Sequence, residues 1–183
     1  MRVLITGAYR FIGRYTAKQY KKMGYTVIGL GHGDWLKNEY TFWGIDIWHS
    51  CDITLENLIL YAEGIDVIVH CAGSGSVGFS IENPMIDFQR TVSTTQFVLE
   101  YIRKYEPKVK LVYPSSAAVY GIVDKLPITT EDDLNPISPY GVHKKIAEEL
   151  CQLYCKQYNI SAVIIRLFSV YGEGLEKQLL WDA

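Results

Sequence analysis

The first thirteen residues of the chain, MRVLITGAYRFIG, place a short apolar run directly before a turn that contains glycine and a helical pattern. Residues 3–5 are Val-Leu-Ile, which is typical of a buried strand. Gly7 allows a tight turn after this strand, and Phe11, Ile12 and Gly13 begin the helix. The N–H groups and the dipole at such a helix start attract a pyrophosphate group. We therefore predict a dinucleotide-binding site at the N-terminus.

Arg10 is the one residue of this turn that departs from the dinucleotide-binding pattern. The turn is Gly-x-x-Arg-x-x-Gly, so an arginine stands where a further glycine is expected. A guanidinium group has a planar shape that suits a phosphate. Two other interpretations are that Arg10 obstructs the turn, or that it points into solvent. For the whole segment, the alternative is a Rossmann-like domain with an empty or degraded site.

Strand-like and helix-like patterns alternate along most of the chain. The predicted strands are residues 3–6, 26–30, 66–70, 109–113 and 162–167, with a further strand near 44–48. The predicted helices are residues 12–23, 55–62, 84–105 and 140–158. Such alternation implies βαβ units, a parallel sheet and right-handed crossovers. The predicted fold class is α/β, with a doubly wound parallel sheet of the Rossmann type.

The composition is that of an ordinary soluble globular protein. Of the 183 residues, 49% are hydrophobic and 21% are charged, and the formal net charge is −2. A charge so close to neutral argues against a nucleic-acid-binding surface. No apolar run approaches the roughly 20 residues of a membrane helix, and the first strand begins too close to Met1 for a targeting peptide. We expect a cytoplasmic protein that binds neither nucleic acid nor membrane.

The four cysteines do not have the spacing of a zinc site. Cys151 and Cys155 lie four residues apart in a helical pattern, a spacing that would also suit a metal pair. Together with Cys51 and Cys71, they are more simply interpreted as small buried thiols in a reducing compartment. We expect no metal site.

Two further motifs carry side chains that are suited to chemistry. Tyr140 and Lys144 are four residues apart in a helical pattern, so their phenol and ammonium groups share one face. A free tyrosine has a pKa of about 10, and a nearby ammonium or a cationic nicotinamide lowers it. Ser116 follows the strand predicted at 109–113, at the strand end where ligands bind in open α/β sheets. Each motif alone also fits a surface pair or a turn serine.

Together, and in this order, the motifs resemble the extended branch of the short-chain dehydrogenase/reductase superfamily. Specifically, they resemble the NAD-dependent epimerase/dehydratase family, which includes the UDP-glucose 4-epimerases. The resemblance extends through nearly the whole chain, in the segments TGAYRFIG, CDIT, DVIVHCAG, SSAAVYG, PITTEDDLNPISPYGVHK and RLFSVYGEG.

The resemblance implies a hydride transfer between a sugar-ring carbon and C4 of a nicotinamide. Tyr140 would be the general acid and base, and Lys144 would lower its pKa and anchor the nicotinamide ribose. Ser116 would orient the reacting sugar oxygen. The implied partner is a nucleotide sugar.

The resemblance also implies which residues contact an NAD(P) cofactor. The pyrophosphate would lie at Phe11 and Ile12, beside Gly7 and Gly13, and the adenine would contact Asp52 and Ile53. Cys71, Ala72 and Gly73 would line the cofactor after a later strand, and Phe168 would lie near the nicotinamide. Tyr140 and Lys144 would also contact the cofactor.

Several positions depart from the family pattern. Dehydratases typically carry an Asp-Glu pair where this chain has Ala117 and Ala118, so epimerase and 4-keto reductase remain as the expected activities. Thr91 and Ser169 stand where asparagines are usual, which leaves the sugar specificity open.

The choice between NAD and NADP rests on two positions. Gly31 stands where NAD-binding proteins hold the adenosine ribose with an acidic residue, although Asp34 follows nearby. Arg10 occupies a position at which single-domain relatives bind the 2′-phosphate of NADP. We therefore favour NADP over NAD.

Residues 1–172 are expected to form the NAD(P)-binding domain, and residues 173–183 the beginning of a truncated substrate-binding portion. The alternative function is a non-catalytic NAD(P)-binding or interaction protein, or an inactive truncated fragment. The resemblance also implies a homodimer paired through a four-helix bundle of the helices at 84–105 and 140–158. The sequence alone does not establish it, because both helices must also cover the sheet.

Overall fold

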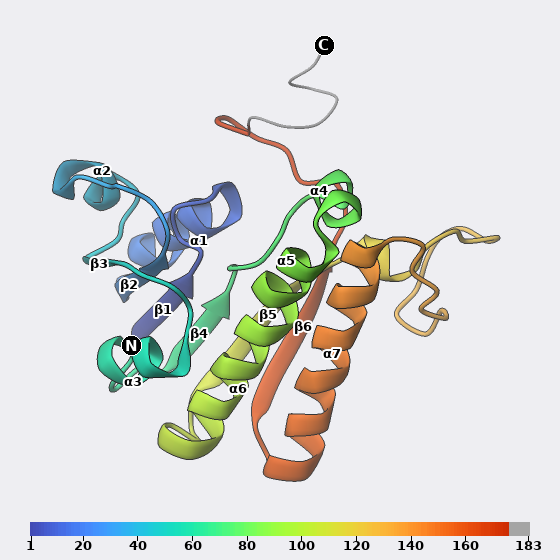
Figure 1. Ribbon diagram of the computed structural model, residues 1–183. Helices are drawn as coiled ribbons and strands as arrows, with labels where there is room; N and C mark the ends of the chain where they lie inside the picture. The colour runs from blue at the N-terminus through green and yellow to red at the C-terminus, as the bar shows by residue number, and fades with distance from the viewer. Residues whose placement is uncertain (176–183) are drawn as a thin grey trace.

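The computed structural model describes residues 1–175, which form a parallel sheet with helices on both faces (Figure 1). The strand order is β3-β2-β1-β4-β5-β6, and every pairing is parallel. The strands are β1 (Arg2–Thr6), β2 (Thr26–Gly31), β3 (Ile47–Ser50), β4 (Val67–His70), β5 (Lys110–Ser116) and β6 (Ser161–Leu167). This is the doubly wound order of the Rossmann fold, so the predicted fold class is confirmed.

Each face of the sheet buries its own apolar core. Figure 1 shows α3, α6 and α7 over the near face, with α1 behind the sheet. The near core contains Leu4, Leu99 and Leu111, and the far core contains Ile5 and Ala17. The helices are α1 (Phe11–Lys22), α2 (Lys37–Phe42), α3 (Leu55–Tyr61), α4 (Val77–Glu82), α5 (Pro84–Phe88), α6 (Thr94–Tyr105) and α7 (Pro139–Tyr158).

The helix predicted at 84–105 is divided in the structure. α5 passes into a π-helical turn at Gln89–Ser93 before α6 begins, and α4 precedes them. The π-helical turn inserts an extra residue into the helical repeat and is often found at functional sites. The alternation of apolar residues does not reveal this insertion, because the backbone remains helical on both sides.

The segment between β2 and β3 also differs from the prediction. α2 was not expected there, and the strand predicted near 44–48 lies at Ile47–Ser50. Gly44 has φ +79° just after the end of α2, so the chain turns before it can begin the strand.

Nothing in residues 1–175 has the form of a membrane anchor or a metal centre. No helix in this part is long and apolar enough to cross a bilayer. No three His, Cys, Asp or Glu side chains gather there as they would around a metal ion. The segment predicted at 173–183 as the start of a second portion lies mostly outside the described residues.

Candidate active site

The turn between β1 and α1 is closely packed because two glycines allow it. Gly7 has φ +68°, and its N–H donates to the Leu30 carbonyl at 2.7 Å. A Cβ on Gly7 would lie 2.7 Å from the Ala72 nitrogen, and a Cβ on Gly13 would lie 2.7 Å from the Ala8 Cα. Both distances are too short for a real Cβ, so both glycines permit backbone contacts that other residues exclude.

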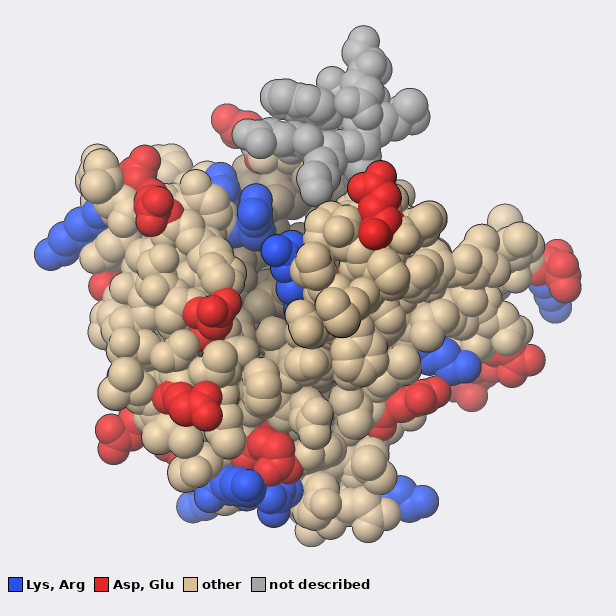
Figure 2. Space-filling model, viewed as in Figure 1, with Lys and Arg blue, Asp and Glu red and all other residues tan. Residues whose placement is uncertain are grey.

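The N-terminus of α1 is open to an anion. Arg10 is the N-cap residue, and its side chain makes no capping hydrogen bond. Phe11 and Ile12 begin the helix, where backbone N–H groups have no partner within the helix itself. Figure 2 shows basic side chains around the hollow between the regions of α1 and α4. The helix start and the positive charges fit the pyrophosphate group predicted from the sequence.

Cys71, Ala72 and Gly73 follow β4 and lie beside the glycine turn. The Ala72 N–H donates to Thr6 Oγ1 at 3.1 Å. Gly73 has φ +144°, and a Cβ there would lie 4.0 Å from Lys144 Nζ. Burial raises the pKa of the Cys71 thiol to about 12, so this thiol stays protonated. The segment therefore lies between the glycine turn, which is predicted to bind the pyrophosphate, and Lys144, which is predicted to be catalytic.

His70, at the end of β4, is a buried polar residue whose role was not predicted from the sequence. Its Nδ1 lies 2.7 Å from Thr6 Oγ1, and its Nε2 lies 3.3 Å from Thr94 Oγ1. Burial lowers the pKa of His70 to about 3, so the ring is neutral near pH 7. Because Thr6 also holds Ala72, His70 joins β1 to β4 where the strand order reverses.

The residues predicted at the adenine end lie after β2 and β3. The Asp52 carboxylate is 2.8 Å from His32 Nε2, and both side chains are largely exposed. Ile53 packs in the near core with Leu58 of α3, so its side chain is buried. A Cβ on Gly31 would lie 3.3 Å from the Gly7 Cα. This strand end therefore carries an imidazole paired with Asp52 and has no carboxylate at position 31.

Arg14 is a second arginine near the turn that was not predicted from the sequence. Its Nε and Nη2 donate to the Tyr9 carbonyl at 3.1 and 2.5 Å. Its guanidinium also lies 5.1–5.7 Å from the ring centres of Tyr9, Trp35 and Trp43. Arg10 differs because it is exposed and, among residues 1–175, its guanidinium makes no hydrogen bond; its nearest aromatic ring is that of Tyr9, whose centre is 6.0 Å away. Of the two arginines, Arg10 is therefore the one whose guanidinium is available to bind a ligand.

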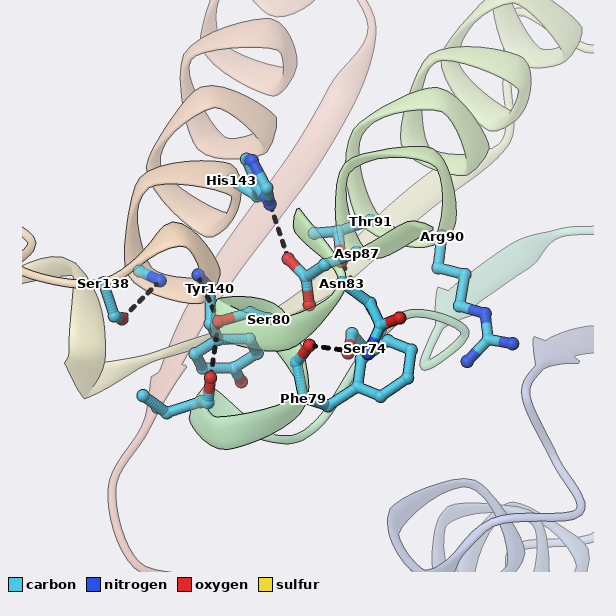
Figure 3. A network of polar contacts seen from close by, with 12 residues as sticks. Ser74, Phe79, Ser80, Asn83, Asp87, Arg90, Thr91, Ser138, Tyr140 and His143 are labelled. Carbon is cyan, nitrogen blue, oxygen red and sulfur yellow. Dashed lines mark hydrogen bonds and ion pairs between the residues drawn. The ribbon is translucent and has the colours of Figure 1, made fainter. Parts of the chain in front are cut away.

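The first turn of α7, which carries Tyr140, is fixed at several points (Figure 3). Ser138 caps the helix by accepting from the Gly141 N–H at 3.1 Å, and Pro139 occupies the first position. The Tyr140 N–H donates to Ser80 Oγ of α4 at 3.0 Å. Tyr140 is therefore held by its backbone, which leaves its phenol group for other contacts.

Lys144 and Ser116 lie where the end of β5 meets the first turns of α7. Lys144 is 6% exposed, and its Nζ donates to the Pro114 carbonyl at 3.0 Å. Ser116 ends β5, and its hydroxyl accepts from the Ala118 N–H at 3.2 Å. The Ser116 side chain also lowers the pKa of Tyr140, so the two side chains lie close together. The structure thus gathers the three predicted catalytic residues at the carboxyl edge of the sheet.

The predicted lowering of the Tyr140 pKa is not found in the protein by itself. Burial raises the pKa of Tyr140, the contact with Ser116 lowers it, and the Asp87 charge raises it again. Lys144 is not among the groups that shift it, and its ammonium donates to the Pro114 carbonyl. Burial also lowers the pKa of Lys144 to about 8. The two groups therefore sit in a site that disfavours both charges.

Asp87 and His143 form a buried pair next to these residues that was not predicted from the sequence. Asp87 is fully buried in α5, and its Oδ2 lies 2.5 Å from His143 Nδ1 in α7. The only signal in the sequence is the position of His143 within the Tyr-x-x-x-Lys motif. Nothing in the sequence shows that α5 brings a carboxylate to it.

Phe168, predicted near the nicotinamide, lies just after β6. Its side chain is 58% exposed, and its ring centre is 6.5 Å from that of Tyr120. Arg166 fixes the end of β6 by donating to the Glu148 carboxylate at 2.8 Å and to the Tyr120 hydroxyl at 2.8 Å. Phe168 also lines a hollow of about 590 Å³ with Leu126, Pro127 and Ile128. Its contact with a nicotinamide stays a prediction.

The glycine turn, the strand order and the grouped Ser, Tyr and Lys side chains agree with a comparison to known families. The model of the NAD dependent epimerase/dehydratase family matches residues 3–180. The chain belongs to this family. The resemblance predicted from its motifs is therefore confirmed.

Individual members of the family are similar to the chain over nearly all its length. The UDP-glucose 4-epimerase of Lactobacillus helveticus is 33% identical over 177 residues, covering 94% of this chain and 52% of that protein. The crystal structure of UDP-glucose 4-epimerase from Brucella ovis in complex with NAD is 31% identical, with a TM-score of 0.80. The alignment covers 91% of this chain and 51% of the Brucella ovis chain.

A further solved structure extends the comparison to another sugar. It is UDP-glucuronic acid 4-epimerase from Bacillus cereus in complex with UDP-glucuronic acid and NAD, 29% identical with a TM-score of 0.81. The alignment covers 94% of this chain and 58% of that one. The chain spans about half the length of the curated relatives that it matches.

Proposed function

We propose that the chain is the cofactor-binding part of a nucleotide-sugar 4-epimerase that acts by hydride transfer. The observation that carries the proposal is the meeting of Ser116, Tyr140 and Lys144 at the sheet edge that also holds the glycine turn. Relatives and solved structures named as UDP-sugar 4-epimerases support this substrate class, and their NAD complexes support the cofactor class.

The residues of the glycine turn fit a dinucleotide. The start of α1 offers backbone N–H groups, and Gly7 and Gly13 leave no room for side chains in the turn. When bound, the nicotinamide supplies the site that accepts the hydride and returns it. Lys144 would donate to the nicotinamide ribose, and the closeness of its Nζ to Gly73, in the segment after β4, supports this role.

Ser116 and Tyr140 would handle the proton of the reacting hydroxyl. The Tyr140 phenolate would accept this proton as the sugar carbon is oxidised, and the resulting phenol would return the proton as the carbon is reduced again. Ser116 holds the sugar oxygen next to Tyr140. Because the proton and the hydride both return, the net reaction inverts one carbon and consumes no cofactor.

A 4-keto reductase is the second candidate activity, since the same three residues would serve it. Ala117 and Ala118 follow Ser116 in a short 3₁₀ turn and offer no titratable group for eliminating water. The test is to incubate the protein with UDP-glucose or UDP-glucuronic acid in the presence of NAD(P)⁺, and with a UDP-4-keto sugar in the presence of NAD(P)H. An epimer without net change in NAD(P)H absorbance supports the epimerase, whereas stoichiometric NAD(P)H oxidation with the keto sugar supports the reductase.

The preference for NADP over NAD is a proposal that rests on Arg10 and Gly31. Arg10 is exposed at the start of α1, and position 31 has no carboxylate to repel a 2′-phosphate. We expect Arg10→Ala to weaken NADP⁺ binding about tenfold, the effect of losing one charge-assisted hydrogen bond, and to leave NAD⁺ binding unchanged. Calorimetric titration with both cofactors measures this.

Lys22→Ala is the control for Arg10→Ala, because Lys22 is an exposed cation at the opposite end of α1. It is expected to leave both affinities unchanged. Equal affinities for the two cofactors that Arg10→Ala does not alter would contradict the NADP preference. Both affinities are measured because the related epimerases were solved in complex with NAD.

We also propose a homodimer that pairs the outer faces of α6 and α7. Phe97 on α6 and Leu153 on α7 are apolar side chains that are 37% and 48% exposed. Phe97→Glu and Leu153→Glu are expected to convert a dimer into monomers, because each substitution would bury a carboxylate at the interface. Sedimentation velocity measures the change. Leu60→Glu on α3, where Leu60 is 67% exposed, is the matched control. A wild type that sediments as a monomer would rule out this pairing.

A further inference from the structure

Asp87 and His143 connect α5 to the part of α7 that carries Tyr140 and Lys144 (Figure 3). Asp87 Oδ2 and His143 Nδ1 are 2.5 Å apart, so one proton lies between them. The Asp87 side chain is fully buried, and that of His143 is 12% exposed. The Phe88 ring meets the imidazole edge-on at 5.3 Å. The pair is thus largely shielded from water.

The other carboxylate oxygen of Asp87 has no hydrogen-bond partner among residues 1–175. Figure 3 shows it directed away from the His143 ring. A buried carboxylate needs hydrogen bonds or an opposite charge to offset the loss of hydration. His143 meets only one of the two oxygens, so the buried charge of Asp87 is only partly offset by a hydrogen bond.

Three elements pack against α5, and each carries ionisable groups. Tyr140 and Lys144 lie on α7, Arg90 lies in the π-helical turn, and Glu82 ends α4. Arg90 and Glu82 are exposed, so water screens their charges. Burial has the largest influence on Tyr140, whose pKa it raises, and on Lys144, whose pKa it lowers. The Asp87 charge raises the pKa of Tyr140, and Cys71, Asp87 and Glu148 together raise that of Lys144.

We propose that Asp87 is a positioning residue for Tyr140 and Lys144, with His143 as its anchor. The Asp87–His143 hydrogen bond holds the first turns of α7 against α5. The negative charge keeps Tyr140 as a neutral phenol and Lys144 as an ammonium until a ligand arrives. This inference rests on the proposed role of Tyr140 in proton transfer.

The test follows the titration of Tyr140 in the ligand-free chain, by NMR of tyrosines labelled with ¹³C at Cζ. The Tyr140 signal is the one that is absent from Tyr140→Phe. Asp87→Asn is expected to lower the Tyr140 midpoint by about one pH unit, because it removes a nearby like charge. His143→Gln keeps the carboxylate and a donor, so no fall is expected. Glu82→Gln, which removes an exposed acid from α4, is expected to have no effect.

A purely structural pair gives a different pattern and would overturn the proposal. In that case Asp87→Asn and His143→Gln would both lower the free energy of unfolding, and they would move the Tyr140 midpoint equally or not at all. If Asp87→Asn does not fold, Asp87→Ser takes its place, since it removes the same charge, and it is expected to lower the Tyr140 midpoint as well. The ¹⁵N shifts of the His143 ring in the wild type are expected to show a protonated Nδ1, and an unprotonated Nδ1 would contradict the hydrogen bond.

Neither measurement requires turnover or a bound sugar. A chain that shows the expected titrations but forms no epimer would contradict the proposed function and leave the role of the Asp87 charge intact. A chain that is an active epimerase but has the same Tyr140 midpoint in Asp87→Asn and His143→Gln would support the proposed function and contradict the role of the Asp87 charge. The two proposals therefore fail separately.

Discussion

Replacing Tyr140 with phenylalanine is expected to lower the rate of sugar epimerisation by about 10²–10⁴-fold, the usual contribution of a positioned acid–base group. The change removes only the phenol oxygen. The backbone N–H that donates to Ser80 remains, so the first turn of α7 keeps its place and cofactor affinity should change little. The measurements are the formation of the product epimer and the NAD(P)H absorbance after a UDP-sugar is added.

Tyr105→Phe is the matched control, because Tyr105 ends α6 and is 50% exposed. It is expected to retain the wild-type rate. Equal rates for the wild type and Tyr140→Phe would show that Tyr140 transfers no proton. A wild type that binds the dinucleotide but forms no product would favour the non-catalytic alternative.

The rate of sugar oxidation should also depend on pH in a defined direction. The phenolate of Tyr140 is the form that accepts the proton, and burial raises the pKa of Tyr140 in the protein by itself. The oxidation rate is therefore expected to increase with pH until that pKa is reached. Tyr140→Phe is expected to lose this dependence along with the rate.

Gly13→Ala is expected to lower the free energy of unfolding by about 3 kcal/mol, as overpacking of a rigid contact does. The added Cβ would collide with the Gly7 carbonyl oxygen and lie 2.7 Å from the Ala8 Cα. Both neighbours are backbone atoms, so α1 must move away from the turn. The same movement displaces the N–H groups proposed to bind the pyrophosphate, so dinucleotide binding should be lost. Urea unfolding and calorimetric titration measure the two effects.

Gly75→Ala is the control for this change, since a Cβ on Gly75 would have no atom within 4 Å. Its effect on the free energy of unfolding is expected to stay within about 0.5 kcal/mol. Similar losses of stability in the two variants would mean that the close packing of Gly13 is not the cause. A stable Gly13→Ala variant that still binds the dinucleotide would place the pyrophosphate elsewhere.

Most of the sheet could be predicted because its strands are apolar runs separated by helical patterns. All the strands that were predicted from such runs are found in the structure, with bounds that shift by a few residues. α2 was missed because Lys37–Phe42 buries no residue and so shows no apolar periodicity. The π-helical turn at Gln89–Ser93 was missed because it interrupts the helical repeat without a Gly or Pro.

The parts of the site that share one segment were predicted, whereas the contacts between segments were not. Tyr140 and Lys144 lie on one helix, so their spacing alone places them together. The Asp87–His143 pair joins residues 56 positions apart, and a sequence does not show which buried acid meets which histidine. The direction of the Tyr140 pKa shift was missed for a similar reason, since burial depends on how α7 packs against α4 and β5.

The contact between Gly7 and Ala72 sets a condition on the order in which the protein can form its site. These residues are far apart in the chain, yet they touch where β1 lies beside β4. During synthesis, β4 and Ala72 must therefore leave the ribosome before the glycine turn can pack against Ala72. Binding of a dinucleotide to a nascent chain would thus report that the centre of the sheet has closed, well before α7 has been made.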